Sequence, residues 1–322
     1  MTTLAAFLSD QNQLAEGLAD TLLALGDAAC DIAALTAVNG LDGQSFGALT
    51  DGSNSDGDQQ KALDVQADQL IEGALTKTRT ALYLSEERDA PVALAQDGSF
   101  IVACDPLDGS SNIDTNLSIG TIFSIWPAAQ GAKSPYLQKG RDQLAAGFFV
   151  YGPQTTLLLT LGSGVFAFCF VPDKKMFMQM DWQVDIPQAT QEFAVNAANQ
   201  RYWQGRSKAY LSDLLAGSDG PRGTHFNMRW CGSLVADGWR IFRRGGIFLY
   251  PSDARKGYEN GRLRLVYEAA AIAFLTEQAG GLATNGNQPI LDIEPMALHQ
   301  RTALVFGSAQ EVRQHASYAE IS

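Results

Sequence analysis

The sequence predicts a layered fold, α+β or α/β, in which α-helices pack against β-sheets. Its 322 residues are enough for a sizeable buried core, and 46% of them are hydrophobic, as in a globular protein. Apolar residues recur at helical spacing near both ends of the chain, whereas the middle contains short apolar runs of strand-forming residues. At about 150 residues per domain, this length indicates two closely packed halves.

Helix and strand signals alternate in the first hundred residues. Apolar positions predict a long amphipathic helix over residues 13 to 38 and a second helix near residues 62 to 77. The stretch between them is rich in glycine, serine and aspartate, so we interpret residues 40 to 62 as a mobile loop. Residues 81 to 84 then predict a short buried strand.

The middle of the chain is predicted to form a β-sheet. Residues 100 to 104 form an apolar run that is too short for a helix, and this predicted strand places Asp105 at its carboxyl end. Further strands are expected at residues 119 to 126 and within residues 145 to 171. In the latter stretch, two apolar segments flank Gly-Ser-Gly at residues 162 to 164, which predicts a hairpin.

The second half of the chain mixes both kinds of element. A polar stretch at residues 188 to 192 follows the predicted sheet, so we expect one half over residues 1–190 and another over residues 191–322. Helical periodicity returns over residues 263 to 279 and ends at Gly280-Gly281, a typical helix stop.

The charge of the chain restricts its partners. Lysine and arginine total 23 against 35 acidic residues, a formal net charge of −12, and no basic stripe is available to follow a nucleic-acid backbone. An acidic protein also repels a phosphorylated substrate unless metal ions or a few cations reverse the field locally. The charge therefore argues against nucleic acid as a partner and points toward metals.

Targeting and cysteine signals indicate a cytoplasmic protein. The four cysteines show neither a disulfide framework nor a zinc-binding spacing. The N-terminus lacks the basic and apolar segments of a signal peptide, and no uninterrupted apolar stretch reaches about 18 residues, so no membrane association is expected.

The most informative motif is the acidic loop that follows the strand at residues 100 to 104. Asp105 and Asp108 lie three residues apart around a proline, and with the Leu107 carbonyl they offer the oxygen ligands that Mg²⁺ prefers. Ser110 and Ser111 add hydroxyls and N–H groups suited to phosphate oxygens. An ordinary turn is the alternative, since Asp, Pro, Gly and Ser dominate turns. The full pattern from Asp105 to Asp114 is more specific than that and predicts a metal-dependent phosphatase.

Other acidic residues extend this prediction. Glu86 and Glu87 close a strand, where adjacent carboxylates repel each other unless a cation relieves them, although a solvated surface pair is the alternative. Glu268 lies in an apolar helical stretch, and a structural pair with Arg264 competes with a metal-binding role. Together with the acidic loop, these clusters favour a site in which metals activate water and stabilise the transferring phosphoryl group.

Asp58 and Asp64 lie in and just after the polar loop. Solvated loop charges are one interpretation of both residues. The other is a loop that closes over bound metal and excludes water, which is a common catalytic device.

In their order and spacing, these motifs resemble the class I fructose-1,6-bisphosphatases, a family of sugar phosphatases. The resemblance rests on Ser85-Glu86-Glu87, the loop from Asp105 to Asp114 and the segment from Gly261 to Glu268, and it extends from roughly residue 14 to residue 310. The segments at residues 58–65, 229–237 and 245–251 also match. The resemblance implies an αβαβα five-layer sandwich, a homotetramer and two or three Mg²⁺ ions per subunit, with Mn²⁺ as a possible substitute.

The resemblance also implies roles for individual residues. The metal-binding groups are Glu86, Asp105, the Leu107 carbonyl, Asp108 and Glu268. The residues that contact the phosphate to be removed are Asp108, Gly109, Ser110 and Ser111. The residues that act on the attacking water are Asp58, Asp64 and Glu87. The groups that hold the sugar and its 6-phosphate are Asn196, Arg229, Tyr250 and Arg262, with Arg229 reaching in from a neighbouring subunit. On this basis residues 1–190 are the metal-binding half and residues 191–322 the sugar-phosphate-binding half.

Some residues depart from the family pattern at the far end of the sugar. Arg262 stands where the family often has lysine. The positive charge is kept, but a planar guanidinium takes the place of a compact ammonium group. Trp230 and Asn199 stand where tyrosines often contact phosphate. Either the 6-phosphate pocket is altered, or Arg255, Lys256 or Tyr258 compensates for these changes.

The expected reaction is hydrolysis of the 1-phosphate of D-fructose 1,6-bisphosphate to fructose 6-phosphate, in gluconeogenesis or the Calvin cycle. The first alternative is a sedoheptulose-1,7-bisphosphatase or an enzyme that accepts both bisphosphates, since one extra hydroxymethine changes only a few contacts. The second is a catalytically silent protein that binds metal or sugar phosphate, because a fold alone does not establish activity.

Overall fold

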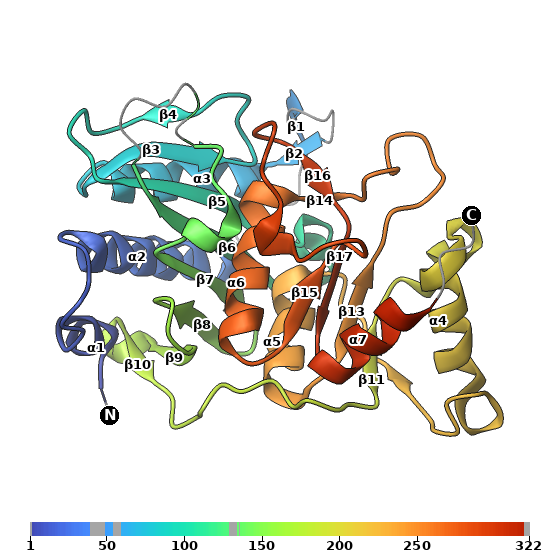
Figure 1. The fold of residues 1–322 in the computed structure, drawn as a ribbon. Coiled ribbons are helices and arrows are strands. Elements are labelled where there is room, and N and C mark those ends of the chain that lie inside the picture. Colours follow the sequence, from blue (N-terminus) through green and yellow to red (C-terminus); the bar gives the residue numbers. More distant parts are fainter. Residues whose placement is uncertain (1, 39–48, 54–58, 129–133, 135, 319–322) are drawn as a thin grey trace.

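Helical layers alternate with sheet layers across the protein (Figure 1). The computed structural model describes residues 2–38, 49–53, 59–128, 134 and 136–318. In order, the layers are helices α2 and α3, an eight-stranded sheet, helices α5 and α6, a five-stranded sheet, and helices α4 and α7. This arrangement confirms the predicted αβαβα sandwich.

The first layer contains α1 (Leu4–Ser9), α2 (Leu18–Ala37) and α3 (Ala62–Leu75). The prediction placed the start of the long helix at residue 13, which is wrong by five residues. Gly17 adopts a left-handed conformation with φ of 87°, so the preceding residues cannot continue the helix. Within the predicted loop, β1 (Leu49–Ser53) and β2 (Gln59–Lys61) pair as an antiparallel ribbon.

The large sheet has the strand order β10-β9-β8-β7-β6-β5-β3-β4. Its strands are β3 (Thr80–Ser85), β4 (Val92–Ala93), β5 (Phe100–Asp108), β6 (Ile119–Pro127), β7 (Ala145–Tyr151), β8 (Thr155–Thr160), β9 (Phe166–Val171) and β10 (Met176–Gln179). The predicted strands and the hairpin between β8 and β9 are confirmed. All pairs are antiparallel except β3 with β5, whose carboxyl ends therefore lie together.

The second sheet has the order β12-β11-β13-β17-β15. Its strands are β11 (Glu192–Ala194), β12 (Asn227–Met228), β13 (Ile247–Tyr250), β15 (Leu282–Thr284) and β17 (Leu304–Gly307). Helices α5 (Leu234–Arg244) and α6 (Ala270–Gln278) separate the two sheets, and α4 (Gly205–Ala216) and α7 (Ala309–Ser317) cover the outer face.

The helix predicted over residues 263 to 279 has a different beginning. Leu263–Arg264 form a short strand, β14, which pairs with β16 (Arg301–Thr302), and residues 265–269 form a single π-helical turn before α6. A π-helical turn contains one residue more than an α-helical turn, so its side chains point in directions that a regular helix would not give them. Such turns are frequent at functional sites.

Short 3₁₀ turns connect several of these elements. They are η1 (Ser110–Thr115), η2 (Gly140–Asp142), η3 (Pro172–Lys174), η4 (Ala197–Tyr202), η5 (Gly217–Asp219) and η7 (Ile290–Asp292).

The central core joins the two sheets through α5 and α6. Phe148 of β7 meets Phe242 of α5 edge to face at a centroid distance of 5.9 Å, and Phe248 packs on Phe306 at 5.2 Å. All four rings are buried, and aromatic contacts of this kind add about 1 kcal/mol each to the area that they bury. The same buried cluster includes Leu265 and Ala269 together with Ile122 of β6, so the turn that carries Glu268 belongs to the core shared by the two halves.

No helix in the described ranges has the length and apolar character needed to span a membrane. The four cysteines are free, and Cys104 is buried as its apolar surroundings indicate. Cys231 is exposed instead, because it lies in the loop before α5.

A buried histidine predicts the response of the fold to acid. His315 on α7 is 1% exposed, its Nε2 lies 3.1 Å from Ser207 Oγ, and Tyr210 packs against its ring. Burial and the charge of Arg206 lower the pKa of His315 to about 4. The unfolded chain binds this proton at about pH 6.5, so stability is lost as the pH falls through the window from 6.5 toward 4.

We therefore expect the wild-type protein to lose more stability than His315→Gln between pH 7 and pH 5. The expected difference is about 2 kcal/mol, from the separation of the two pKa values. Urea unfolding of both proteins at the two pH values measures it. Equal losses in both proteins would contradict the assignment of this acid sensitivity to His315.

Candidate active site

Three buried carboxylates meet at the junction of the two halves. Oxygen atoms of Asp105, Asp108 and Glu268 all lie within 4.8 Å of one another. Asp105 and Asp108 end strand β5, and Glu268 belongs to the π-turn before α6. The structure thus brings together two acidic clusters that are separated by 160 residues in the sequence.

An irregularity in β5 lets Asp105 and Asp108 share one side of the strand. In a regular strand, residues three apart point to opposite faces. Here Asp105 pairs with Ile122 and Asp108 with Gly120, so three steps on β5 oppose two on β6. This bulge reverses the alternation once. The Leu107 N–H donates to Asp105 Oδ1 at 3.0 Å, which fixes the turn between the two aspartates.

Asp108 is held by the start of helix α5. Its carboxylate accepts hydrogen bonds from Ser233 Oγ at 2.6 Å, from the Leu234 N–H at 3.1 Å and from the Val235 N–H at 3.0 Å. Burial raises the pKa of Asp108, while these bonds act in the opposite direction. The N-terminal dipole of the helix also favours the charged form.

Gly109 is required at this contact for two reasons. Its φ of 80° is left-handed, and a Cβ added to it would lie 2.7 Å from Ser233 Cβ. The turn it makes leads into η1, which begins with Ser110 and Ser111 beside the carboxylates.

Glu268 is oriented by the strand before it. Its Oε2 accepts a hydrogen bond from the Arg264 N–H at 2.6 Å, and burial raises its pKa to about 7. The Arg264 guanidinium Nε lies 3.6 Å from Glu86 Oε1. The pairing of Arg264 with Glu268 that the sequence allowed therefore runs through the backbone, and the guanidinium also reaches the Glu86 carboxylate.

Glu86 belongs to the same electrostatic cluster. Burial and then the charge of Glu268 raise its pKa well above the ordinary value, opposed by Arg264. Burial and then the charges of Glu86 and Glu268 do the same for Asp105. With a side chain only 17% exposed, Glu86 is not the solvated surface residue of the alternative interpretation. Its neighbour Glu87 is half-buried beyond the end of β3.

This donor set fits a divalent metal. It consists only of oxygen ligands, including the Leu107 carbonyl, and hard cations such as Mg²⁺ prefer oxygen. Several buried carboxylates that repel one another are costly to keep ionised, and a divalent cation between them removes that cost. The residues present therefore suit the metal that the sequence resemblance implies.

Of the three residues predicted to act on the attacking water, the structure describes Asp64 and Glu87. Asp64 lies in the first turn of α3 and is 4% exposed, so it is not a solvated loop charge. Glu87 follows β3 at the edge of the acidic cluster. Asp58 lies outside the described residues.

Two of the residues predicted at the far end of the sugar, Tyr250 and Arg262, interact with each other, and Tyr250 also interacts with Glu268. Tyr250 ends strand β13, and its pKa is raised by burial, lowered by Arg262 and raised by Glu268. The Arg262 guanidinium lies 4.6 Å from the centre of the Tyr258 ring. The Trp230 ring stacks on Tyr250 at a centroid distance of 6.3 Å.

The other two residues lie on exposed surface. Asn196 Oδ1 accepts a hydrogen bond from the Ala198 N–H and begins η4. Arg229 lies in the segment between β12 and α5. The pKa of Glu192 is lowered chiefly by Arg240, then by Arg244 and Arg229. Exposure of Arg229 is compatible with the predicted reach into a neighbouring subunit.

Sequence reasoning missed Ser233 as a residue of the site. Its hydroxyl donates to Asp108 and also accepts from the Ala236 N–H, the N-terminal bond of helix α5. A serine directly before an apolar helical stretch is a known start signal, so the helix cap could have been predicted. Its contact with Asp108, 125 residues away, could not.

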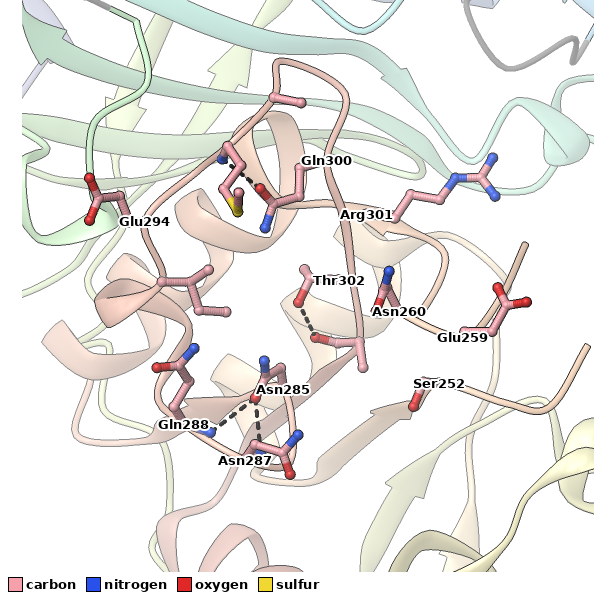
Figure 2. A pocket seen from close by; sticks show the side chains of 14 residues that line it. Ser252, Glu259, Asn260, Asn285, Asn287, Gln288, Glu294, Gln300, Arg301 and Thr302 are labelled. Atoms are coloured by element: carbon pink, nitrogen blue, oxygen red, sulfur yellow. Dashed lines mark hydrogen bonds between the residues drawn. The ribbon is translucent and has the colours of Figure 1, made fainter. Parts of the chain in front are cut away.

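A separate cavity of about 680 Å³ is lined by residues other than the three carboxylates (Figure 2). Side chains that face it include Asn260, Asn285, Gln288 and Gln300. Arg301 lines the same cavity, and its charge opposes in small part the rise that burial causes in the pKa of Glu268.

Comparisons with known proteins agree with this geometry. The model of the fructose-1-6-bisphosphatase N-terminal domain matches residues 3–181, and that of the C-terminal domain matches residues 186–320. The chain is 51% identical over 324 aligned residues to a class 1 fructose-1,6-bisphosphatase of Azorhizobium caulinodans, covering 98% of both proteins. It is 47% identical to one of Cereibacter sphaeroides, covering 98% of this chain and 94% of the relative.

A solved structure shows the same fold. The fructose-1,6-bisphosphatase of Leishmania major in its holo form superposes with a TM-score of 0.90 at 33% sequence identity, covering 98% of this chain and 97% of the other. With both family models matched and relatives at about half identity over nearly the full length, the chain belongs to the fructose-1,6-bisphosphatase family.

Proposed function

We propose that this protein hydrolyses the 1-phosphate of D-fructose 1,6-bisphosphate to yield fructose 6-phosphate and phosphate, as a magnesium-dependent phosphoric monoester hydrolase. The observation that carries the proposal is the buried cluster of Asp105, Asp108 and Glu268 beside the turn at Ser110, in a chain of this family. The proposed setting is cytoplasmic carbohydrate metabolism, in gluconeogenesis or the Calvin cycle.

The metal-binding groups are the five predicted from the sequence, and the donor chemistry favours Mg²⁺ over softer ions. When bound, two or three divalent ions would lower the pKa of the attacking water and neutralise charge on the transferring phosphoryl group. Residues 1–190 supply four of these groups, and Glu268 comes from the half over residues 191–322. The proposed metal site therefore uses a residue from each half, although most of its groups come from residues 1–190.

The chain's own residues divide the remaining work. The turn from Asp108 to Ser111 places hydroxyls and N–H groups around the phosphate that leaves the sugar. Asp64 and Glu87, with Asp58, orient the attacking water and accept its proton. Positions that are partly or fully buried, such as that of Asp64, also keep bulk water away.

The far end of the substrate lies toward the second sheet. Tyr250 and Arg262 hold the sugar and its 6-phosphate, with Asn196 at the edge and Arg229 donated by a neighbouring subunit of a homotetramer. A contact between the Arg262 guanidinium and the Tyr258 ring orients the planar fork for a phosphate group.

Asp105→Asn tests the metal site. We expect kcat to fall by at least about 100-fold, because one ligand to the ions is lost. The melting temperature in EDTA should stay equal or rise, because one of several mutually repelling buried charges is removed. Phosphate release and thermal unfolding measure the two effects.

The exposed Asp142 provides a control for Asp105→Asn. Asp142→Asn makes the same chemical change outside the site and should leave kcat and the Mg²⁺ requirement unchanged. If Asp105→Asn retained more than about a tenth of the activity, the assignment of the ligands would be wrong.

Arg262→Met tests the 6-phosphate contact. Loss of the cation should raise KM for fructose 1,6-bisphosphate about 10-fold and change kcat less than about 2-fold, because this end of the sugar does not react. Arg243→Met is the control, since Arg243 is also exposed but stacks on Trp182. An unchanged KM in Arg262→Met would move the 6-phosphate to other residues.

Steady-state kinetics on two substrates tests the choice of sugar. We expect kcat/KM for fructose 1,6-bisphosphate to exceed that for sedoheptulose 1,7-bisphosphate by about 10-fold. One extra group on a substrate typically lowers kcat/KM by about this factor. A reversed ratio would assign the protein to the seven-carbon substrate.

A further inference from the structure

Three side chains join helix α3 to the end of strand β3. Asp68 of α3 accepts a hydrogen bond from Tyr83 Oη at 2.9 Å through Oδ1 and from Arg88 Nε at 2.6 Å through Oδ2. We call this group of Asp68, Tyr83 and Arg88 the Asp68 clamp. Arg88 also donates to Glu72 Oε2 at 2.6 Å, so its guanidinium contacts two successive turns of α3.

The clamp is built from strong interactions. Asp68 is 5% exposed and Tyr83 is fully buried, while the Arg88 side chain is 27% exposed. Arg88 Nη2 lies 2.5 Å from the same Asp68 oxygen that accepts from Nε. Charge-assisted bonds that converge on a buried carboxylate hold their partners in a narrow range of positions.

Residues of the proposed active site lie on both sides of the clamp. Asp64 is four residues before Asp68 on α3, so the two side chains lie on the same face one turn apart. Glu86 and Glu87 lie between Tyr83 and Arg88 in the sequence. The clamp therefore ties the helix that carries Asp64 to the segment that carries the two glutamates.

The main chain of this segment is also held close to the end of β3, where the Glu87 N–H donates to Ser85 Oγ at 3.2 Å. Strand β3 ends at Ser85, and the main chain turns back through bonds from the Glu86 N–H to the Cys104 carbonyl and from the Arg88 N–H to the Ser85 carbonyl. The charges of Glu86 and Glu87 repel each other, and Glu86 is also repelled by Glu268. Arg264 offsets part of this repulsion at Glu86, and the clamp holds the segment from the side of α3.

We propose that Arg88, acting through Asp68, is a positioning residue that sets the separation between Asp64 and the Glu86-Glu87 pair. The inference rests on the proposed function and adds to it a residue that touches neither substrate nor metal. Both metal affinity and activation of water depend on this separation, because displacement of about 1 Å at a catalytic group can cost about 100-fold in rate.

The competing explanation is that the clamp only stabilises the fold. A second group of the same composition, far from Asp64 in the sequence, allows the two explanations to be separated. Glu311 of α7 accepts from Tyr210 Oη at 2.6 Å and from Arg222 Nη2 at 2.7 Å. We call this group the Glu311 clamp.

The two clamps match in their environment as well as their chemistry. The guanidinium carbon lies 5.9 Å from the ring centre of Tyr83 in the Asp68 clamp and 5.8 Å from that of Tyr210 in the Glu311 clamp. The arginine side chains are 27% and 17% exposed, and the carboxylate side chains 6% and 9%. Loss of either arginine should thus destabilise the fold to a similar extent.

The experiment compares Arg88→Met with Arg222→Met in the full-length protein. Both should lower the melting temperature. Only Arg88→Met should lower kcat, by about 10-fold, and raise the Mg²⁺ concentration for half-maximal activity several-fold, with KM for fructose 1,6-bisphosphate changed less than about 2-fold. Calorimetric titration with MgCl₂ alone should show the same weakening for Arg88→Met without any turnover.

Arg88→Lys and Tyr83→Phe complete the series. Lysine keeps the charge but not the fork, so Arg88→Lys should restore part of the Mg²⁺ affinity. Tyr83→Phe removes one bond to Asp68 and keeps the buried ring, so it should shift Mg²⁺ dependence in the same direction by a smaller amount. It also tests the inference if Arg88→Met does not fold.

Two results separate the inference from the proposed function. If wild type releases phosphate with Mg²⁺ while Arg88→Met and Tyr83→Phe keep its kcat and Mg²⁺ affinity, the clamp is only structural and the inference is overturned. If wild type itself shows no metal-dependent release from fructose 1,6-bisphosphate, the proposed function fails. Weaker binding of MgCl₂ to Arg88→Met than to Arg222→Met would still support the positioning role in that case.

Discussion

Repulsion among carboxylates buried between two sheets is the constraint on which this structure depends. Asp105, Asp108 and Glu268 place their oxygens within 4.8 Å of one another, and Glu86 adds a further charge. On the surface, water would screen the repulsion between such carboxylates. In a buried site the repulsion is strong, and the surrounding structure must hold the side chains in place against it. The bulge in β5 and the π-turn before α6 are backbone irregularities at the points where these side chains are presented.

Helix α5 connects the two halves at this constraint. Its N-terminus supplies three hydrogen bonds to Asp108, and its apolar face packs on Phe148 of the first sheet. The segment just before it carries Arg229 and Trp230, which are predicted at the sugar end. Asp108 of the proposed metal site is thus bonded to the start of a helix that directly follows Arg229 and Trp230. On the proposed assignment, this contact fixes the distance between the groups that bind the two ends of the substrate.

Stability and chemistry make opposite demands on these residues. A fold selected only for stability would replace buried carboxylates by apolar side chains, because unpaired buried charge is costly. Here the charges are retained, with Arg264 near Glu86 and the start of helix α5 bonded to Asp108. The family relationship gives the reason: a phosphatase needs oxygen ligands at a place from which bulk water is removed.

The sequence by itself determined the mixed helix-and-sheet fold, most strands and the three carboxylates that the structure brings together. Apolar periodicity and the loop from Asp105 to Ser111 are local signals that depend only on neighbouring residues. The π-turn at residues 265–269 and the contact of Ser233 with Asp108 were decided by tertiary structure alone. Each depends on groups that meet only when both sheets are packed, and no local pattern encodes the distance between side chains far apart in the chain.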